Sequence, residues 1–569
     1  MIILDRIGGI NLEKSYYIVY QEGSDIASIL IEIGLNNFII LNEKLAVLYT
    51  PVDFNSDILK NIYEVSWFDE SAPMSSMIDL TNYVETGNGA RRISGVDYIY
   101  NNAYNDVTGK GILIAIIDSG VDYLHPDLIR DDGSSKILSL WDQEGSINPP
   151  PEGYLFGSEF TREELNAAIA RNDGSLSRDD VGTGTVAAGI TVGNGRINSN
   201  YKGIAEGSDL ITVKLRSYPG RYYVEKSNYT TTDFLAAFSY VINIAIREEK
   251  SLIINLTVGQ RASLGFSLAL NTFTELEYPG IAVVNGAGNK RNTYVHYSGK
   301  LKNQTDVNDI IIEYGDGQNL DIYLEGSDLD RINATIISPS GESSYTAHYA
   351  PDYYEYTGIF NLENTTYRVR YYYPSISTGS ELLEINLRNM RPGAWTLRVR
   401  PDTYLNGEYH VYLPNSNLLD DDDGFIDTSS NSTITLFGTG ENILTVGTYD
   451  NRYDSLWIGS SVGPTRGVSA KPDFVAPGVN VVSTYGNNSY VSGTGAGISS
   501  SVTSGILALT MQYLNRQSSN PKLLLYSQVL KTYLMIGATR NELFYYPNDS
   551  QGYGVIDFRR TIQIISDSL

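Results

Sequence analysis

Short apolar runs alternate with amphipathic segments along most of the chain, which is 569 residues long. The run at 111–120 is continuous and ends in Asp, Ser and Gly, as a parallel strand buried on both faces does. Similar runs lie at 209–215, 251–259, 280–289 and 442–450. Helical periodicity separates them, as in 231–249. The pattern predicts an α/β fold with a doubly wound parallel sheet, whose site lies at the carboxyl ends of the strands.

The first 75 residues have a compact βαβ-like pattern of their own. The pattern predicts a strand at 15–21, a helix at 25–34, a hairpin at 37–51 and a helix that runs into a strand at 57–71. A further helix is expected around 81–95. We therefore predict an α+β domain at 1–75.

Residues 301–437 interrupt the succession of apolar runs and helical segments. They contain tyrosine-rich segments in which apolar and polar residues alternate, as in antiparallel strands. This pattern predicts an all-β sandwich, of the jelly-roll kind, inserted in a loop of the α/β domain. The α/β domain is then expected in two parts, 76–300 and 438–569.

Composition and charge exclude several kinds of partner and site. Lys and Arg number 41 and Asp and Glu 66, so the formal charge is 41 − 66 = −25. We expect no nucleic-acid partner, because phosphate contacts need clustered basic residues. The chain has no cysteine, which excludes disulfides and thiolate metal sites, and only four histidines. The N-terminus does not read as a secretory signal, and no apolar run is long enough to span a membrane.

The stretch 492–516 begins with Gly493, Gly495 and Gly497 and turns directly into an apolar, helix-length segment. Helix N-termini reached from such turns often hold a nucleophile, because unpaired amides and the helix dipole stabilise negative charge there. No nucleophile stands at this turn.

Several ordered segments carry a family resemblance. The segments are GKGILIAIIDSGVDYLHPDL, KGIAEGSDLITVKL, IINLTVG, VVNGAGN, KPDFVAPGVNVVS and SGTGAGISSSVTSG. In this order they resemble the landmarks of subtilisin-like serine proteases. The N-terminal segment, which resembles a subtilase prodomain, and the β insertion look most like the clostridial germination proteases (Csp), and among them the catalytically inactive, CspC-like members.

The resemblance assigns the catalytic positions residue by residue. Asp118 matches the aspartate that orients the catalytic histidine, but the family's G-H-G-T motif has Thr183 in the histidine position. A threonine hydroxyl cannot accept a proton near neutral pH. His125 belongs to the Asp118 motif, and none of His296, His348 and His410 is placed by its motif to act as the base.

Glycine occupies the nucleophile position. Counting back from Gly505 places the family's serine at Gly497, whereas a gap-free reading from Gly493 chooses Gly495. Ser499, Ser500 and Ser501 are interpreted as small helix-packing residues.

The remaining cleft positions match the family. Asn289 matches the amide that binds the oxyanion, and Gly286 is expected to face the same crevice. The strand along which a substrate peptide lies corresponds to Leu256, Thr257, Val258 and Gly259.

The resemblance therefore implies a pseudoprotease that acts as a signalling or binding scaffold in spore germination. In subtilisin, loss of the serine or the histidine alone lowers kcat about two million-fold. Without self-cleavage, we expect residues 1–75 to stay attached and occupy the cleft. The resemblance implies as partners a sibling Csp protease, another germination protein or a small-molecule germinant, and implies a location in the spore.

Two other hypotheses stay open. The first is an active endopeptidase with a rearranged triad that processes a cortex-hydrolase precursor, which requires a histidine close to a hydroxyl nucleophile. The second is a carbohydrate- or partner-binding β insertion. No cofactor or metal is expected, because the acidic run 420–423 would place Leu419 at the first ligand position of a calcium loop.

Overall fold

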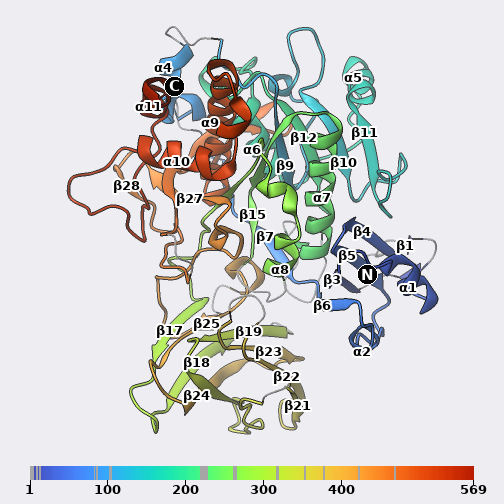
Figure 1. Ribbon diagram of the computed structural model, residues 1–569, viewed down its shortest axis with the longest axis vertical. Helices are drawn as coiled ribbons and strands as arrows, with labels where there is room; N and C mark the ends of the chain where they lie inside the picture. The colour runs from blue at the N-terminus through green and yellow to red at the C-terminus, as the bar shows by residue number, and fades with distance from the viewer. Residues whose placement is uncertain are drawn as a thin grey trace.

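The computed structural model shows an α/β body, with the N-terminal unit beside it and a β insertion at one end (Figure 1). The insertion is at the bottom of this view and the N-terminal unit at the right. The structure describes residues 6–7, 10–11, 14–82, 84, 88–100, 106–217, 228–260, 266–315, 319–350, 354–375, 379–420, 423–466 and 470–568.

A largely parallel sheet forms the centre of the α/β body and confirms the predicted fold class. The strand β9 lies in its middle, between β12 and β14, and its seven residues are all buried. The edge strands β11 and β28 are antiparallel, and β29 pairs with β27. In sheet order the strands are β11 (Ser158–Thr161), β10 (Ile137–Asp142), β12 (Asp209–Lys214), β9 (Ile112–Asp118), β14 (Ser251–Leu256), β16 (Ile281–Gly286), β27 (Ile443–Asp450) and β28 (Ser455–Leu456), with β29 at Phe474–Pro477.

Helices cover both faces of this sheet. Alternate residues of β9 point to opposite faces, so Ile114 packs in one hydrophobic core and Ala115 in the other. The first core contains α6 (Thr183–Val192), α9 (Ala496–Gln517), α10 (Ser527–Gly537) and α11 (Phe558–Ser568). The second contains α7 (Thr231–Arg247) and α8 (Phe266–Asn271), while α5 (Arg162–Arg171) packs at the β10–β11 edge.

The N-terminal unit is a four-stranded antiparallel sheet with two helices, which confirms the strand and helix positions predicted there. Its strand order is β4 (Phe38–Asn42), β5 (Leu45–Thr50), β3 (Lys14–Tyr20) and β6 (Val65–Glu70). The helices are α1 (Ile26–Glu32) and α2 (Asp57–Lys60), and a small hairpin joins β1 (Arg6–Ile7) to β2 (Ile10–Asn11). One face of the sheet packs against α7 and α8 of the body.

The single helix predicted around 81–95 was wrong. In the described part of this stretch, Thr81 ends β8 (Asp79–Thr81) and the helical residues are those of α3 (Ala90–Ile93), while residues 83 and 85–87 lie outside the described residues. The strand β7 (Pro73–Ser76) precedes the stretch and the short helix α4 (Asp97–Tyr100) follows it. The strand β8 pairs with β31 (Ser489–Thr494), which itself pairs with β30 (Val481–Tyr485). Hydrogen bonding to the body thus overrides the local helical pattern.

Two antiparallel sheets form the β insertion and enclose a core that includes Phe360, Trp395 and Tyr409. The first sheet has the order β17 (His296–Lys300), β25 (Glu408–Tyr412), β19 (Asn319–Gly326), β23 (Leu382–Arg388), β22 (Thr365–Tyr372) and β21 (Tyr354–Phe360). The second has the order β20 (Arg331–Ile337), β24 (Gly393–Thr403), β18 (Asn308–Tyr314) and β26 (Gly424–Phe425).

The insertion also holds the N-terminal unit through a buried ion cluster. Arg370 of β22 lies 2.5 Å from Glu384 and 3.6 Å from Asp69 of β6. Beside this cluster the rings of Trp67 and Tyr372 lie 5.6 Å apart. The N-terminal unit is therefore packed against both the body and the insertion.

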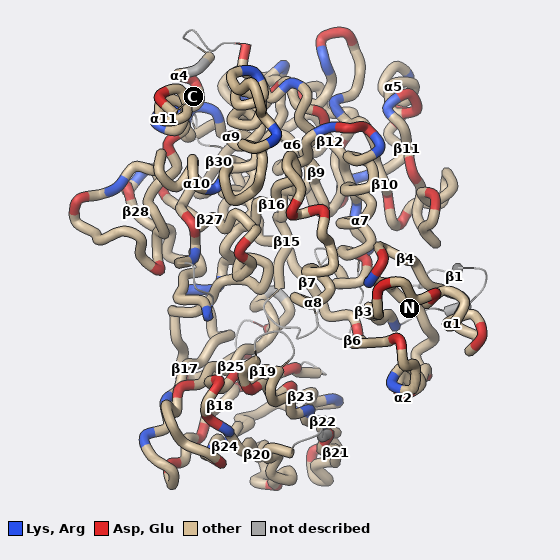
Figure 2. Tube along the Cα trace, viewed as in Figure 1, with Lys and Arg blue, Asp and Glu red and all other residues tan. Residues whose placement is uncertain are grey.

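Acidic and basic residues are interspersed along the trace rather than gathered by sign (Figure 2). Among the helices of the described residues, none is both long and apolar enough to cross a membrane.

The ion cluster makes the stability of the N-terminal unit depend on pH. Burial raises the pKa of Asp69 to about 6, whereas an unfolded aspartate titrates near 3.9. Between these values the folded state holds more protons, so the free energy of unfolding falls as the pH rises from about 4 to about 6. Asp69→Asn has no carboxyl group to titrate, so this decrease in the free energy of unfolding disappears. We expect the free energy of unfolding of the variant, minus that of wild type, to be about 1–2 kcal/mol larger at pH 7 than at pH 4.5.

Urea denaturation followed by tryptophan fluorescence measures this difference. Asp53→Asn, an exposed change in the same unit, is the matched control and should follow wild type at both pH values. An unchanged pH dependence in Asp69→Asn would contradict the assignment.

Candidate functional site

The carboxylate of Asp118 lies at the carboxyl end of β9 and is fully buried. Its Oδ1 accepts hydrogen bonds from the Ser119 backbone N–H at 2.6 Å and from the Thr183 hydroxyl at 2.5 Å, and its Oδ2 accepts one from the Thr257 hydroxyl. Burial raises the pKa of Asp118, and the hydroxyl and amide donors oppose this shift. The Asp118 carboxylate is thus held by neutral donors alone.

Thr183 is the first residue of α6, and its side chain is buried. The hydroxyl donates its single proton to Asp118. The hydroxyl of Ser119 lies 2.9 Å from that of Thr183 and itself donates to Asp179 at 2.7 Å. Thr183 therefore takes the place next to Asp118 that the sequence comparison gives to a histidine.

Asp179 is a second carboxylate of this network, which sequence reasoning missed. It accepts from the Gly182 backbone N–H at 2.7 Å and from both the backbone N–H and the hydroxyl of Thr185. Burial raises the pKa of Asp179 too. Its position three residues before Gly182, as an N-terminal capping acid for α6, was the available signal.

Gly497 lies in the first turn of α9. A Cβ atom added there would lie 3.2 Å from the Met77 carbonyl oxygen and 2.6 Å from Cγ1 of Ile78. At Gly495 φ is +130°, which strains any other residue, and a Cβ atom would lie 2.4 Å from the same oxygen. Of the two candidates, Gly497 is thus the residue with ordinary helical backbone whose side chain would point at the Met77–Ile78 peptide.

Two N–H donors converge on the Met77 carbonyl oxygen. The Gly497 backbone N–H donates to it at 3.0 Å and the Asn289 side-chain amide at 3.2 Å. Asn289 is fixed in turn, since its Oδ1 accepts from the Ala496 N–H at 2.8 Å. Gly286 allows this approach, because a Cβ atom there would lie 2.5 Å from the Ala496 carbonyl oxygen. Paired donors of this kind stabilise negative charge on a carbonyl oxygen.

The peptide cleft is filled by the chain's own segment 73–77. The strand β7 lies antiparallel between β13 (Asn228–Thr230) and β15 (Val258–Gly259). Within this sheet Ser76 pairs with Val258, and the Met77 N–H donates to the Thr257 carbonyl at 2.7 Å. Of the predicted cleft residues, 257–259 therefore contact a bound strand, whereas Leu256 ends β14 and its carbonyl accepts from the Ser500 hydroxyl. Met77 lies at the two donors described above.

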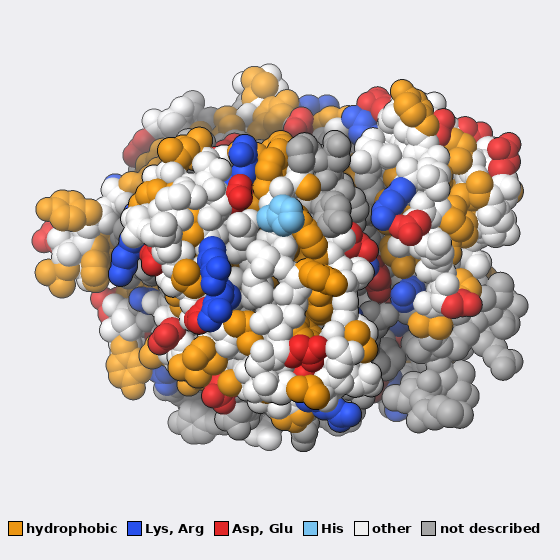
Figure 3. Space-filling model, turned by 90° about the horizontal axis from the view of Figure 1, so that it is seen from below, with side chains coloured by type: hydrophobic (Ala, Val, Ile, Leu, Met, Phe, Trp, Pro, Cys, Tyr) orange, Lys and Arg blue, Asp and Glu red, His pale blue; other side chains and the backbone are white. Residues whose placement is uncertain are grey.

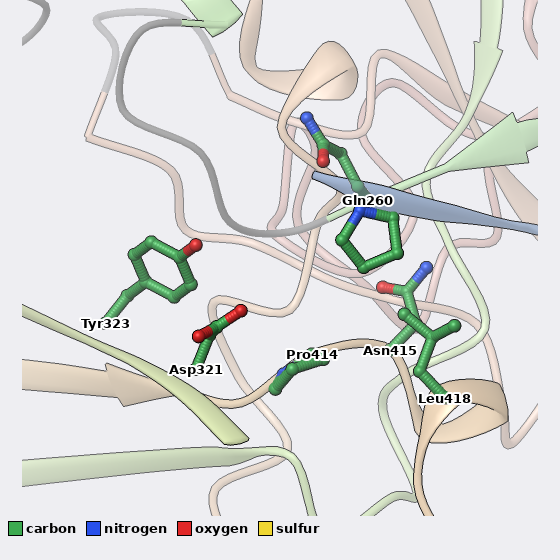
Figure 4. Close-up of a pocket in the computed structure, with 7 residues that line it drawn as sticks. Gln260, Asp321, Tyr323, Pro414, Asn415 and Leu418 are labelled. Carbon is green, nitrogen blue, oxygen red and sulfur yellow. The ribbon is translucent and has the colours of Figure 1, made fainter. Parts of the chain in front are cut away.

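The β insertion closes the outer side of this strand (Figure 4). Asn415 donates to the Ser75 hydroxyl and to the Gly259 carbonyl, both at 2.7 Å. A small cavity remains beside it, lined by Pro73, Gln260, Asp321, Tyr323, Pro414, Asn415 and Leu418. The insertion thus contacts both the bound strand and the cleft wall.

The four histidines form contacts away from Asp118. His125 is buried, its Nε2 lies 3.2 Å from the Ser489 carbonyl, and its Nδ1 accepts from the Asp127 N–H at 3.2 Å. His296 and His410 contact each other at 3.1 Å within the insertion, and His348 contacts Tyr356. Asp118, whose bonds are given above, has no histidine among its hydrogen-bond partners in the described part of the chain.

The serines that follow Gly497 are all buried and bonded inside the helix packing. Ser499 donates to the Ala476 carbonyl at 3.0 Å, Ser500 to Asn255 at 2.8 Å and Ser501 to the Gly497 carbonyl at 2.8 Å. These contacts agree with the interpretation of the three residues as packing residues. No group of three or more His, Asp or Glu side chains suited to a metal ion occurs in the residues that the structure describes.

Comparisons with known proteins identify the family of this chain. The model of the subtilase family matches residues 109–361 and 415–554. Subtilisin from Bacillus sp. (strain TA39) is 25% identical over 217 residues, which are 37% of this chain and 43% of that protein. The PII-type proteinase of Lacticaseibacillus paracasei is 23% identical over 508 residues, which are 79% of this chain and 25% of that protein. The chain thus spans less than half the length of these curated relatives.

Among solved structures, the CspB protease of Clostridium perfringens superposes with a TM-score of 0.74 at 25% sequence identity. The match covers 84% of this chain and 98% of that protein, so it extends beyond the α/β body. With the family model matching more than half of its residues, this chain belongs to the subtilase family.

Proposed function

We propose that this chain is a pseudoprotease, a subtilase fold that serves as a binding and signalling scaffold in spore germination. The observation that carries the proposal is the 2.5 Å bond from the Thr183 hydroxyl to Asp118. A general base must accept a proton from the nucleophile. Thr183 instead donates its proton to the carboxylate, and its hydroxyl has no basicity near pH 7.

The glycine at the start of α9 supports the same proposal. Gly497 offers its backbone N–H to the Met77 carbonyl but has no side chain that could attack the carbonyl carbon. Removing both nucleophile and base leaves the amide donors, which alone give on the order of a thousandfold assistance over water. The cleft is suited to hold a peptide strand without cutting it.

In this proposal residues 1–75 are a retained prodomain and 76–81 its connection to the body. Self-cleavage normally frees a subtilase prodomain. Here the strand β7 pairs on both sides, and contacts to the insertion add to its hold on the cleft. An outside peptide therefore has to displace this strand before it binds.

The germination role rests on similarity to the Clostridium perfringens CspB protease. We propose a sibling Csp protease or another germination protein as partner, a small-molecule germinant as the signal and the spore as the location. The alternative, an active endopeptidase that processes a cortex-hydrolase precursor, needs a histidine beside a nucleophile. Its support is weakened by His125, both of whose ring nitrogens contact backbone groups.

Intact mass and an activity probe test the proposal directly. We expect the purified chain to keep its N-terminal unit at neutral pH, because no residue can start self-cleavage. We also expect no covalent labelling by a fluorophosphonate, with an active subtilisin as positive control. Stoichiometric labelling, or loss of residues up to Met77 in the absence of another protease, would refute the pseudoprotease.

Restoring the missing groups tests the geometry of the cleft. In Thr183→His with Gly497→Ser, we expect cleavage between Met77 and Ile78, because a side chain at 497 points at that peptide and the two donors already hold its carbonyl. Mass spectrometry should find a new N-terminus at Ile78.

The matched control is Thr183→His with Gly497→Ala, which has similar bulk and no nucleophile and should remain intact. Because a Cβ atom at 497 crowds Ile78, a third variant adds Ile78→Ala to give it room. Cleavage at another bond, or folded histidine–serine variants that all stay intact, would contradict the assignment of Met77.

A further inference from the structure

A cavity of ≈ 610 Å³ lies apart from the peptide cleft. Three stretches that are distant in sequence meet there: residues 93–98, the end of β27 with its following turn at 449–454, and the chain between 539 and 559. Its volume falls in the range of sites that hold small organic molecules. None of its lining residues is among the cleft residues described above.

Two arginines supply the unused hydrogen-bonding capacity of this cavity. Arg559, in the first turn of α11, lies over the ring of Tyr98 with its guanidinium carbon 4.4 Å from the ring centroid. Arg540 donates its Nε N–H to the Tyr553 carbonyl at 3.2 Å, and its guanidinium carbon lies 5.9 Å from the centroid of the Tyr553 ring. Neither guanidinium forms an ion pair with a carboxylate of the described residues.

The two carboxylates that line the cavity are already bonded to protein donors. Asp557 accepts from the Thr539 hydroxyl at 3.0 Å through one oxygen and from the Arg560 backbone N–H at 3.0 Å through the other. Asp454 accepts from the Tyr449 hydroxyl at 2.5 Å. These bonds occupy both oxygens of Asp557 and one oxygen of Asp454, whereas the guanidinium of Arg559 and the terminal N–H groups of Arg540 keep hydrogen-bonding capacity for a ligand.

Aromatic rings form much of the remaining wall. Tyr98, Tyr449 and Tyr546 line the cavity, and such rings suit a flat apolar body. Apolar side chains continue onto the surrounding surface, where Leu543 is 85% and Tyr545 96% exposed. Figure 3 shows hydrophobic side chains on the part that projects at its left edge, the side on which β28 lies in Figure 1.

From these observations we infer that the cavity is a binding site for an organic oxyanion, a carboxylate or a phosphate attached to an aromatic or other flat apolar body. The guanidinium of Arg559 and the free N–H groups of Arg540 bind the oxyanion, since arginine matches planar oxyanions with paired hydrogen bonds. The tyrosines contact the body. The inference does not depend on the proposed function, because the cavity shares no residue with the cleft.

The site also lies close in sequence to the connection between the N-terminal unit and the body, residues 76–81. Residues 93–98 follow β8, which continues the strand that fills the cleft. A ligand that binds Tyr98 and Arg559 together links residues 93–98 to α11. Amide hydrogen exchange in residues 93–100 should therefore slow when the site is filled.

Calorimetric titration of the full chain tests the site with defined probes. Naphthalene-2-carboxylate and 2-naphthyl phosphate each carry the predicted chemistry, naphthalene-2-carboxamide is the uncharged counterpart, and inorganic phosphate lacks the apolar body. We expect one saturable site for at least one of the naphthyl anions and at least about tenfold weaker binding of the carboxamide, because it loses the charge-assisted bonds. The stronger of the two anions identifies the head group.

Variants decide whether the arginines are responsible. Arg540→Gln with Arg559→Gln should weaken anion binding at least about tenfold, while Arg560→Gln, on the same helix but outside the cavity, should bind as wild type. Circular dichroism checks folding, and the two single variants replace the double variant if it does not fold. Equal binding of carboxylate and carboxamide, saturable binding of inorganic phosphate alone, no saturable binding of any anion, or unchanged binding in the arginine variants overturns the inference.

Discussion

The carbonyl oxygen of Met77, held between the Gly497 N–H and the Asn289 amide, fixes how the rest of the molecule is arranged. The strand β7 reaches this oxygen by pairing with β13 and β15. The N-terminal unit therefore precedes it on one side, and the chain continues on the other as β8, which pairs with β31. The N-terminal unit is thereby set against α7 and α8, and the insertion is able to reach it through Asn415 and Arg370. These contacts all follow from the placement of one peptide unit.

The burial of the Asp118 carboxylate explains why its surroundings are rich in hydroxyls. A carboxylate removed from water is costly unless it is paired or hydrogen-bonded. In a working triad, the imidazolium formed during catalysis supplies part of that compensation. Here Thr183, Thr257 and the Ser119 N–H supply hydrogen bonds without charge, and burial still raises the pKa of Asp118. The network is complete as a structural unit, with a donor at each carboxylate oxygen.

Much of this arrangement could be predicted from the sequence, because strands buried on both faces read as unbroken apolar runs. The run that contains Asp118 is β9, and the alternating, tyrosine-rich segments form the antiparallel strands of the insertion. The helix expected around 81–95 was wrong because Thr81 pairs with Ser492 of β31 and Gly89 with Val482 of β30, so that among its described residues only 90–93 are helical. The role of Met77 and the cavity at Arg559 could not be predicted, since they arise where segments hundreds of residues apart meet. Asp179, 60 residues from its partner Ser119, was missed although its place before Gly182 was a signal. The hydrophobic pattern of one segment does not show which distant segment it will contact.

The strand in the cleft belongs to the same chain as the cleft, and this has a consequence for competition. A segment tethered by a few residues acts at an effective concentration in the millimolar range, whatever the amount of protein in the cell. A free peptide with the same contacts would need a comparable concentration to replace it. A partner that opens the cleft must therefore gain its binding energy elsewhere. The N-terminal unit meets the insertion at Asp69 and Arg370. Loosening this junction or the surface of the N-terminal unit would lower the local concentration of the strand at the cleft.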